Sequence, residues 1–468
     1  MRRVQLAEIK ASWRAWLSVS VVFIAINAAL CITATLYWTG HVAVREGRIE
    51  WFDSVYYTAS QGINAVFILL VALPVINSVT GLVVDSRRGA LARLALAGAS
   101  PRQVRSTITT QLVVVTLASA VIGAAITVIA ARPWLIFTAN MSDEGFIFLE
   151  PVLSPIPIVA TTLACTLIAV VAGYRQANAA SRIPPVEALR LSQAPPTRPR
   201  LKASGWVKTV LLALVIVISW LSVSIQVAHP YKETVSNLFI LSLAQIFLWG
   251  ALLSVIAPVL VIPMTRFWTH LVPSKSPSWL LARATVSARA DRLYKSVVPI
   301  MFTFVLGVGA LSVDETGMRT LKLALGLDDI EQANIWFYAY IFGLPLIIAF
   351  SAGVVSLIMM GRQRDAELAL VGVVGATPKQ RIWAPIFEAV IITGSALLLS
   401  LIAIVPSLAF QAYALVSMEF EWTLVVPWAV GACILSGGMV ITALATVLPT
   451  IPASRLPEPR VIARLVAE

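Results

Sequence analysis

Residues 87–103 read RRGALARLALAGASPRQ, and residues 364–380, which begin 277 positions later, read RDAELALVGVVGATPKQ. The second stretch is an imperfect copy of the first. The agreement is strongest over the last six positions, which pair Gly98 with Gly375, Ala99 with Ala376, Ser100 with Thr377, Pro101 with Pro378, Arg102 with Lys379, and Gln103 with Gln380. A repeat at this separation indicates a chain built from two related halves.

Each copy has the residue pattern of a helix, a tight turn and a second helix. The glycine suits the left-handed position just past a helix C-terminus. The Ser or Thr two residues later suits the N-cap of the next helix, and the proline then falls at the first helical position, where its missing N–H costs nothing. The glutamine at the third helical position completes a capping box. We therefore predict two rigid turns, the first corner (residues 87–105) and the second corner (residues 364–381).

Both corners lie between long apolar segments. Hydrophobic residues make up 59% of the chain and charged residues only 12%, whereas about a quarter of a soluble domain is charged. A membrane-spanning helix needs about 20 apolar residues. Ten segments qualify: 15–37, 61–84, 107–131, 153–174, 207–227, 236–263, 297–313, 335–360, 383–411 and 424–449. The expected fold class is an all-α integral membrane protein with ten transmembrane helices, because the alternation of a membrane barrel is not seen in this sequence.

The distribution of basic residues predicts the orientation. With the N-terminus in the cytoplasm, all but six of the 35 Lys and Arg residues fall in cytoplasmic segments, as the positive-inside rule requires. The six exceptions are Arg45, Arg48, Arg132, Lys232, Arg319 and Lys322. We expect a multi-pass protein of the inner or plasma membrane with both termini cytoplasmic. The net charge of +12 then reflects a basic face beside anionic lipid rather than a nucleic-acid partner.

The repeat and the spans together predict the domain organisation. Residues 1–195 would form a first four-helix repeat and 279–468 a second, each with its corner between its second and third spans. A central pair of helices (206–264) would lie between them, joined by cytoplasmic linkers at 196–205 and 265–278. Two similar bundles can rock against each other in a transporter, although any duplicated helical membrane protein would show the same repetition.

Catalytic and metal-binding residues are not expected. His41, His229 and His270 lie in different predicted loops, and neither a CxxC motif nor a histidine cluster suggests a metal site. The cysteines fall within predicted spans and are interpreted as packing residues. Acidic residues are nearly absent from the middle of the spans, which argues against an ion-coupled carrier. A membrane-embedded enzyme is the more distant alternative.

The repeated corner is the candidate functional site. A rigid turn at the membrane surface can receive a push from a soluble partner and pass it to two spans, although a well-capped loop with basic anchors would look similar. Its presence in both halves favours the coupling role. The predicted coupling residues are Arg87, Arg88, Arg93, Gly98, Ala99, Ser100, Pro101, Arg102 and Gln103 in the first corner, and Arg364, Glu367, Gly375, Ala376, Thr377, Pro378, Lys379 and Gln380 in the second.

The second corner carries a family resemblance. Residues 367–370 (ELAL) and 375–380 (GATPKQ) resemble the FtsX-like permease family of ABC transporters, which includes the MacB, Lol and Bce-type permeases. The segment after the fourth span, 185–190 (PVEALR), is similar to the family's ending, whereas the first corner has Ala90 at the family's acidic position. The plan of four, two and four spans is similar to the Bce-type permeases but lacks a large extracellular domain between spans seven and eight.

The resemblance implies the permease subunit of an ABC transporter. This sequence contains no G-x-x-x-x-G-K-[ST] phosphate loop, so ATP and Mg²⁺ would bind a separate ATPase, with two ATPase copies for the two corners. The expected function is export or extraction of an amphiphilic substrate, such as a lipid, peptide or drug, through mechanical transmission. The alternative is a non-transporting scaffold or sensor driven by an ATPase, as in Bce-type sensing of and resistance to antimicrobial peptides.

The predicted outer loops carry an acidic cluster. Its members lie between the seventh and eighth spans and are Asp314, Glu315, Asp328, Asp329 and Glu331. Such a cluster can attract a cationic peptide, and we treat these residues as possible substrate contacts. Acidic outer loops also follow simply from the retention of basic residues on the inside.

Overall fold

The computed structural model describes residues 13–139, 149–180, 201, 203–228, 234–274, 276–288, 290–325, 335–361 and 375–447. Every regular element within these ranges is a helix. The helices are α2 (Trp13–Arg45), α3 (Trp51–Ser86), α4 (Arg88–Leu96), α5 (Pro101–Ala139), α6 (Pro155–Ala180), α8 (Ala203–Ala228), α9 (Thr234–Leu271), α10 (Pro277–Ala288), α11 (Ala290–Phe304), the π-helix η1 (Val305–Ala310), α12 (Leu311–Leu325), α13 (Ile335–Gly361), α15 (Pro378–Val416) and α16 (Trp428–Val447).

Nine helical stretches in the described residues are long and apolar enough to cross a bilayer, and they correspond to the first nine predicted spans. The tenth predicted span falls on α16, whose apolar part Trp428–Leu444 is shorter than the other nine. The structure therefore confirms an all-helical, multi-pass chain within its described residues, while the number of ten spans stays a prediction.

The two longest helices reach well beyond the hydrocarbon layer. α5 and α15 have 39 residues each, or about 58 Å at the rise of an α-helix, against about 30 Å of bilayer core. Each begins at the proline of a corner. Each corner is therefore continuous with a helix that is long enough to cross the whole bilayer.

The seventh span differs most from its prediction. The sequence indicated a short segment, 297–313, but the structure has one helical stretch from Leu293 to Thr320 that passes through α11, η1 and α12. It is the most completely buried of the nine spans. Its middle is a π-helix, in which each backbone hydrogen bond joins residues five apart instead of the four of an α-helix. Such turns are often found at functional sites.

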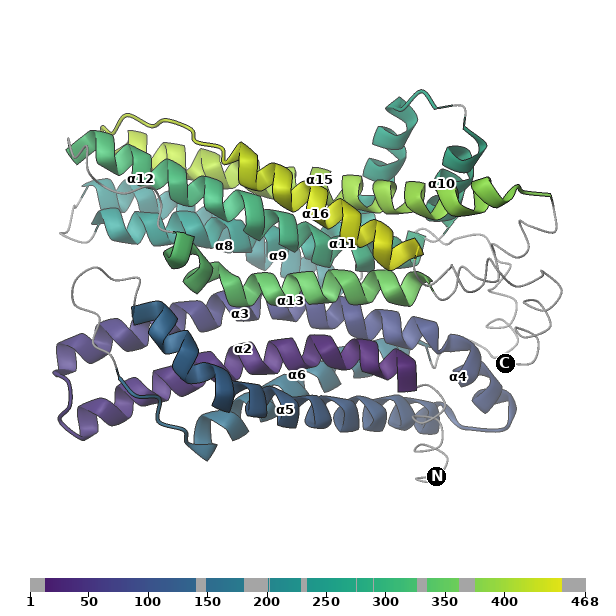
Figure 1. Ribbon diagram of the computed structural model, residues 1–468, viewed down its shortest axis with the longest axis horizontal. Coiled ribbons are helices and arrows are strands. Elements are labelled where there is room, and N and C mark those ends of the chain that lie inside the picture. The colour runs from purple at the N-terminus through teal and green to yellow at the C-terminus, as the bar shows by residue number, and fades with distance from the viewer. Residues whose placement is uncertain are drawn as a thin grey trace.

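The helices form two bundles that meet along their first two helices (Figure 1). α2, α3, α5 and α6 pack together, as do α11, α13, α15 and α16 with η1. Across the interface, α13 packs on α2 and α3, and α11 packs on α3. α8 packs on α9, which in turn contacts α15, α11 and α3, so the central pair lies mainly against the second bundle.

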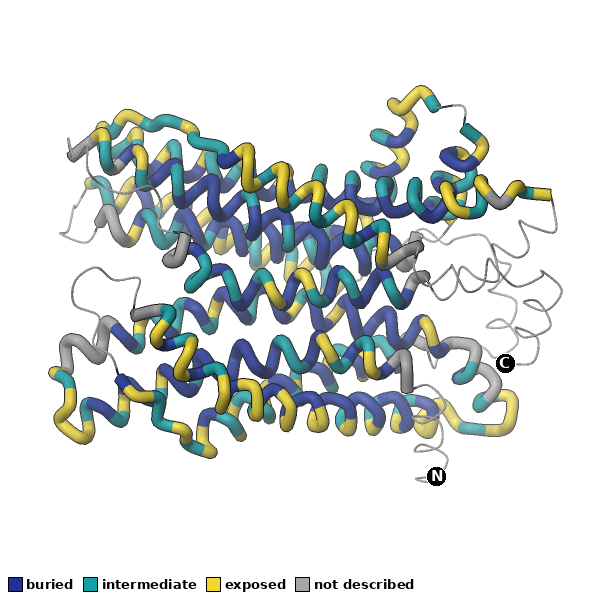
Figure 2. Tube along the Cα trace, in the orientation of Figure 1, coloured by how far each residue is buried: buried dark blue, intermediate teal, exposed yellow. Residues whose placement is uncertain are grey.

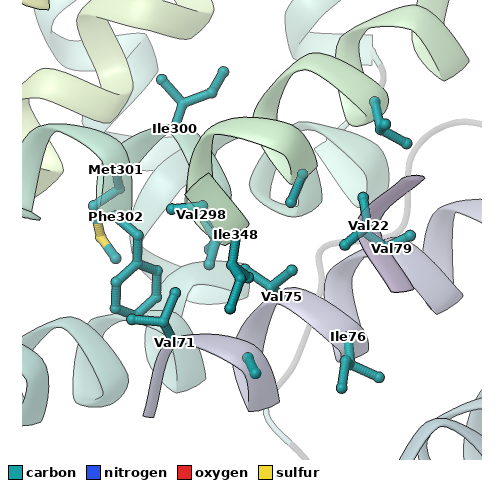
Figure 3. Close-up of a cluster of buried hydrophobic side chains, with 14 of the residues drawn as sticks. Val22, Val71, Val75, Ile76, Val79, Val298, Ile300, Met301, Phe302 and Ile348 are labelled. Atoms are coloured by element: carbon teal, nitrogen blue, oxygen red, sulfur yellow. The ribbon is translucent and has the colours of Figure 1, made fainter. Parts of the chain in front are cut away.

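Close-packed aliphatic and aromatic side chains hold the two bundles together. Val71 and Val75 on α3 meet Ile348 of α13 and Val298 and Phe302 of α11 (Figure 3), and all five are buried. Lipid tails are as apolar as these side chains, so the stabilisation comes from packing rather than from escape from water. Figure 2 shows the matching pattern, with buried residues along the middle of the molecule and exposed ones along outer helices such as α5.

Candidate functional site: two capped corners and the buried contacts behind the first

The first corner lies between α4 and α5 and is closed by backbone hydrogen bonds. Gly98 has a φ of 90°, in the left-handed region that favours glycine. Its N–H donates to the Ala95 carbonyl at 3.1 Å, and the N–H of Ala99 donates to the Leu94 carbonyl at 3.1 Å. These two bonds form a Schellman motif, which satisfies the last carbonyls of α4.

A capping box opens α5. The N–H of Ser100 donates to Gln103 Oε1 at 2.8 Å, and the N–H of Gln103 donates to Ser100 Oγ at 3.4 Å. Pro101, the first residue of α5, needs no partner for a backbone N–H. The helix–turn–helix geometry predicted for the first corner is therefore confirmed.

The second corner has the same geometry in its described part. Gly375 has a φ of 101°, and Thr377 is the N-cap of α15. The N–H of Thr377 donates to Gln380 Oε1 at 2.9 Å, and the N–H of Gln380 donates to Thr377 Oγ1 at 3.4 Å. The helix predicted before Gly375, with Arg364 and Glu367, lies outside the described residues.

Both corners lie at the same end of the molecule. Figure 1 shows α4 and the beginning of α15 at the right-hand end of the bundle, while α12 lies towards the left-hand end. We refer to these as the corner end and the far end. The shared location means that one soluble partner, or a symmetric pair, can reach both turns from one side of the membrane.

Most described corner side chains are accessible. The exposed residues are Gly98, Ser100, Pro101, Arg102, Gln103, Gly375, Thr377 and Lys379, while Ala99, Ala376 and Gln380 are half-buried. Arg88, Arg93 and Pro378 belong to helices, but their side chains lie outside the described set. Arg102 and Lys379 occupy equivalent positions, so the described part of each corner presents a cation to solvent at the same place.

Arg87 differs from the other coupling residues whose side chains the structure describes because it is buried. Its guanidinium donates to the Gln111 side chain on α5 and lies 5.4 Å from the centre of the Trp16 ring on α2. A guanidinium combines directed hydrogen bonds with stacking on an aromatic face. Arg87 therefore anchors the base of the first corner to two helices of its own half instead of facing a partner.

A buried ion pair joins the same region to the other half. Lys295 on α11 pairs with Asp85, which lies one residue before the end of α3, and each side chain is 6% exposed. A Cβ on Gly81 would come within 3.0 Å of the Lys295 Nζ, so the missing side chain leaves room for the lysine. Asp85 and Arg87 are two residues apart, so the base of the first corner contacts both halves.

Sequence reasoning placed Lys295 in a cytoplasmic segment but did not pair it with Asp85. The two residues are 210 positions apart, and neither belongs to a local motif. The available signal was general: a charged residue at the edge of an apolar span usually finds an opposite charge.

The predicted acidic outer loop is wrong at its first two positions. Asp314 and Glu315 lie within α12, in the continuous span Leu293–Thr320, and only 1% of Asp314 is exposed. The helix continues through these positions instead of ending at 313. Asp328, Asp329 and Glu331 lie outside the described residues. The structure thus changes the placement of Asp314 and Glu315, while the role of the acidic residues as substrate contacts stays a prediction.

The FtsX-like permease C-terminal family matches the chain twice, over residues 62–185 and 332–457. Each match starts near the beginning of the second helix of a half and includes the corner, the third helix and the fourth. No curated protein matches the chain. The two family matches together cover more than half of the sequence. The chain therefore belongs to the FtsX-like permease family, whose members are the non-catalytic membrane subunits that work with ABC ATPases.

Proposed function

We propose that this chain is the membrane-spanning subunit of an ABC transporter, with ten spans, both termini and both corners on the cytoplasmic side, and one ATPase bound at each corner. The observation that carries the proposal is the recurrence of one capped turn at one end of the bundle, with Arg102 and Lys379 exposed at equivalent positions. The asymmetric distribution of Lys and Arg supports the cytoplasmic placement of this end.

The corners are suited to transmit force because the polar backbone groups are satisfied on both sides of Gly98, and the capping box satisfies those that begin α15 after Gly375. A push on the first corner is passed along α5, which packs on α2, and a push on the second is passed along α15, which packs on α9 and α11. α2 and α11 both belong to the interface between the halves. ATP and Mg²⁺ act on the partner, and the response of this chain is a shift of one half against the other.

An amphiphile that reaches the protein through the bilayer fits this architecture best. α2 ends at Arg45 and α3 begins at Trp51, so the far-end connection between them is too short to hold a receptor domain. The exposed faces of α5 and α8 are apolar and lie in lipid. We propose that the substrate is a lipid, peptide or drug that is exported or extracted from the membrane. The competing function is that of a sensor that does not transport.

Site-specific photo-crosslinking tests the proposed ATPase contact. A photoreactive residue at Arg102 or at Lys379, both exposed at the corner end, should form a covalent adduct with an ABC ATPase in native membranes. The same residue at Arg319, exposed in α12, is the matched control and should not. The adducts are identified by mass spectrometry.

Two results would count against the proposal. Adducts from Arg319 but not from the corners would place the partner at the far end. Adducts from both corners to membrane proteins alone would favour a scaffold without a bound ATPase.

A further inference from the structure

The seventh span contains a carboxyl group with no visible partner. Asp314 in α12 is 1% exposed, and neither of its carboxyl oxygens has a hydrogen-bond partner among the described residues. The two ion pairs found in the described part of the chain do not include it. A buried polar group without partners is uncommon in folded proteins and calls for an explanation.

The neighbouring donors are already engaged with the backbone. The Tyr338 hydroxyl on α13 is near enough to interact electrostatically with Asp314, but it donates its hydrogen to the Leu306 carbonyl in η1. The Gln411 amide on α15 donates to the Val313 carbonyl at 2.7 Å. These side chains stabilise the helix backbone around Asp314, and no donor among the described residues reaches its carboxyl oxygens.

No cation among the described residues pairs with Asp314 to compensate the negative charge that it would carry when ionised. η1 contributes only apolar residues and glycine, and α9 brings the aromatic ring of Phe239 against the next turn of α12. Tyr338 is the titratable side chain that faces Asp314 from α13. On α12 itself, Glu315 is half-buried and Arg319 is exposed, and Arg319 forms no ion pair with Asp314 among the described contacts.

The π-helix gives this arrangement a second, independent feature. η1 (Val305–Ala310) ends directly before α12, and its wider turn changes the direction in which all later residues of the span point. The hydrogen bond from Tyr338 to Leu306 supplies one carbonyl of the π-helix with a donor. π-helical turns are concentrated at functional sites, and this one sets the orientation of Asp314.

We propose that Asp314 is a proton-binding site. An ionised carboxylate that has no donor and no cation in a buried position is strongly disfavoured against the neutral acid, so the group carries a proton in the conformation described here. It loses the proton when the second half moves and brings α12 into contact with water. A proton fits better than a metal ion, because the described residues contain no group of three His, Cys, Asp or Glu side chains that could hold one.

This site makes the conformation of the permease dependent on pH, whether or not an ATPase is bound. Acidification favours the conformation with Asp314 buried, and alkalinisation favours the conformation in which it is hydrated. Since the inference rests on the surroundings of Asp314 and not on the corners, a test of it is separate from a test of the coupling role.

Infrared spectroscopy of the full chain in lipid nanodiscs tests the proposal. The wild type should show the carbonyl stretch of a protonated carboxyl group at neutral pH. Asp314→Asn, which keeps the shape and neutrality of the protonated acid, should lack that signal. Glu315→Gln, which removes the adjacent and more accessible carboxyl, is the matched control and should retain it. Loss of the signal in the control but not in Asp314→Asn would overturn the assignment.

Chemical labelling of the wild type gives a second readout that does not depend on how a variant folds. Dicyclohexylcarbodiimide reacts with protonated carboxyl groups in apolar surroundings, and mass spectrometry locates the adduct. We expect labelling of Asp314 at neutral pH, less labelling at alkaline pH, and no protection by Na⁺, K⁺, Mg²⁺ or Ca²⁺. Absence of the adduct, or protection by one of these ions at constant pH, would contradict a proton site, and protection would assign a cation site instead.

Discussion

Replacement of both corner glycines by valine, Gly98→Val with Gly375→Val, should stop ATP-driven movement of the two halves while leaving the protein inserted and folded. Both glycines have positive φ, where a side chain costs about 1–2 kcal/mol and a β-branched residue is a clear outlier. A new Cβ would meet no atom within 4 Å at either position. The damage is therefore a change of backbone conformation confined to the two turns.

We expect at least about a tenfold loss of coupling, since about 1.4 kcal/mol of turn strain at each corner corresponds to that factor in an equilibrium constant. The measurement is the ATP-dependent change in distance between spin labels placed on α3 and α13. Ala97→Val is the matched control, because Ala97 is exposed and adjacent to Gly98 but does not have positive φ. A double variant that moves like the wild type would remove the corners from the coupling mechanism.

Lys295→Ala should cause the largest loss of stability of any single charge removal in the described part of the chain. The substitution leaves the Asp85 carboxylate buried without its ammonium partner, and breaking one side of a buried ion pair typically costs about 3–5 kcal/mol. Because the pair joins α3 to α11, the loss also weakens the contact between the two halves. Denaturant unfolding of the purified protein in mild detergent measures the effect.

The double variant Asp85→Asn with Lys295→Met separates the cost of breaking this ion pair from a loss of packing. Replacement of both partners by neutral groups of similar size is often close to neutral for stability, so this variant should recover most of the loss. Arg319→Ala removes an exposed cation and should change stability by less than about 0.5 kcal/mol. If Lys295→Ala is as stable as Arg319→Ala, the ion pair contributes nothing to the interface.

The corners were predictable because their structure is decided by a few adjacent residues. A left-handed turn needs glycine, and a capping box needs Ser or Thr followed three residues later by Gln, whatever lies elsewhere in the fold. Gly98, Ser100 and Gln103 therefore behave as their local sequence indicates. The apolar spans were predictable for a similar reason, since hydrophobic length alone identifies a transmembrane helix.

The end of the seventh span could not be predicted in this way. Asp314 and Glu315 follow an apolar run, and adjacent acidic residues usually mark the point where a helix leaves the membrane. The structure instead continues the helix to Leu325, and Asp314 is buried. That outcome depends on the packing of helices distant in sequence, and on whether the carboxyl carries a proton, neither of which is encoded in the local pattern.

The Asp85–Lys295 ion pair shows the same limit over a longer distance. Each residue separately fits a charged position at the end of a span, and the positive-inside rule accounts for the lysine without a partner. Only the packing of α3 on α11 brings them together. Contacts between the two halves depend on tertiary packing, and the repeat in the sequence does not specify how its two copies are arranged.

The central claim is that an ATPase drives this chain through its two corners. Isolation of the protein from its native membrane in mild detergent, followed by identification and counting of the chains that co-purify, tests it most directly. We predict an ABC ATPase at two copies per permease. Recovery of a different membrane protein with no ATPase, from membranes in which the wild-type chain is intact, would contradict the claim.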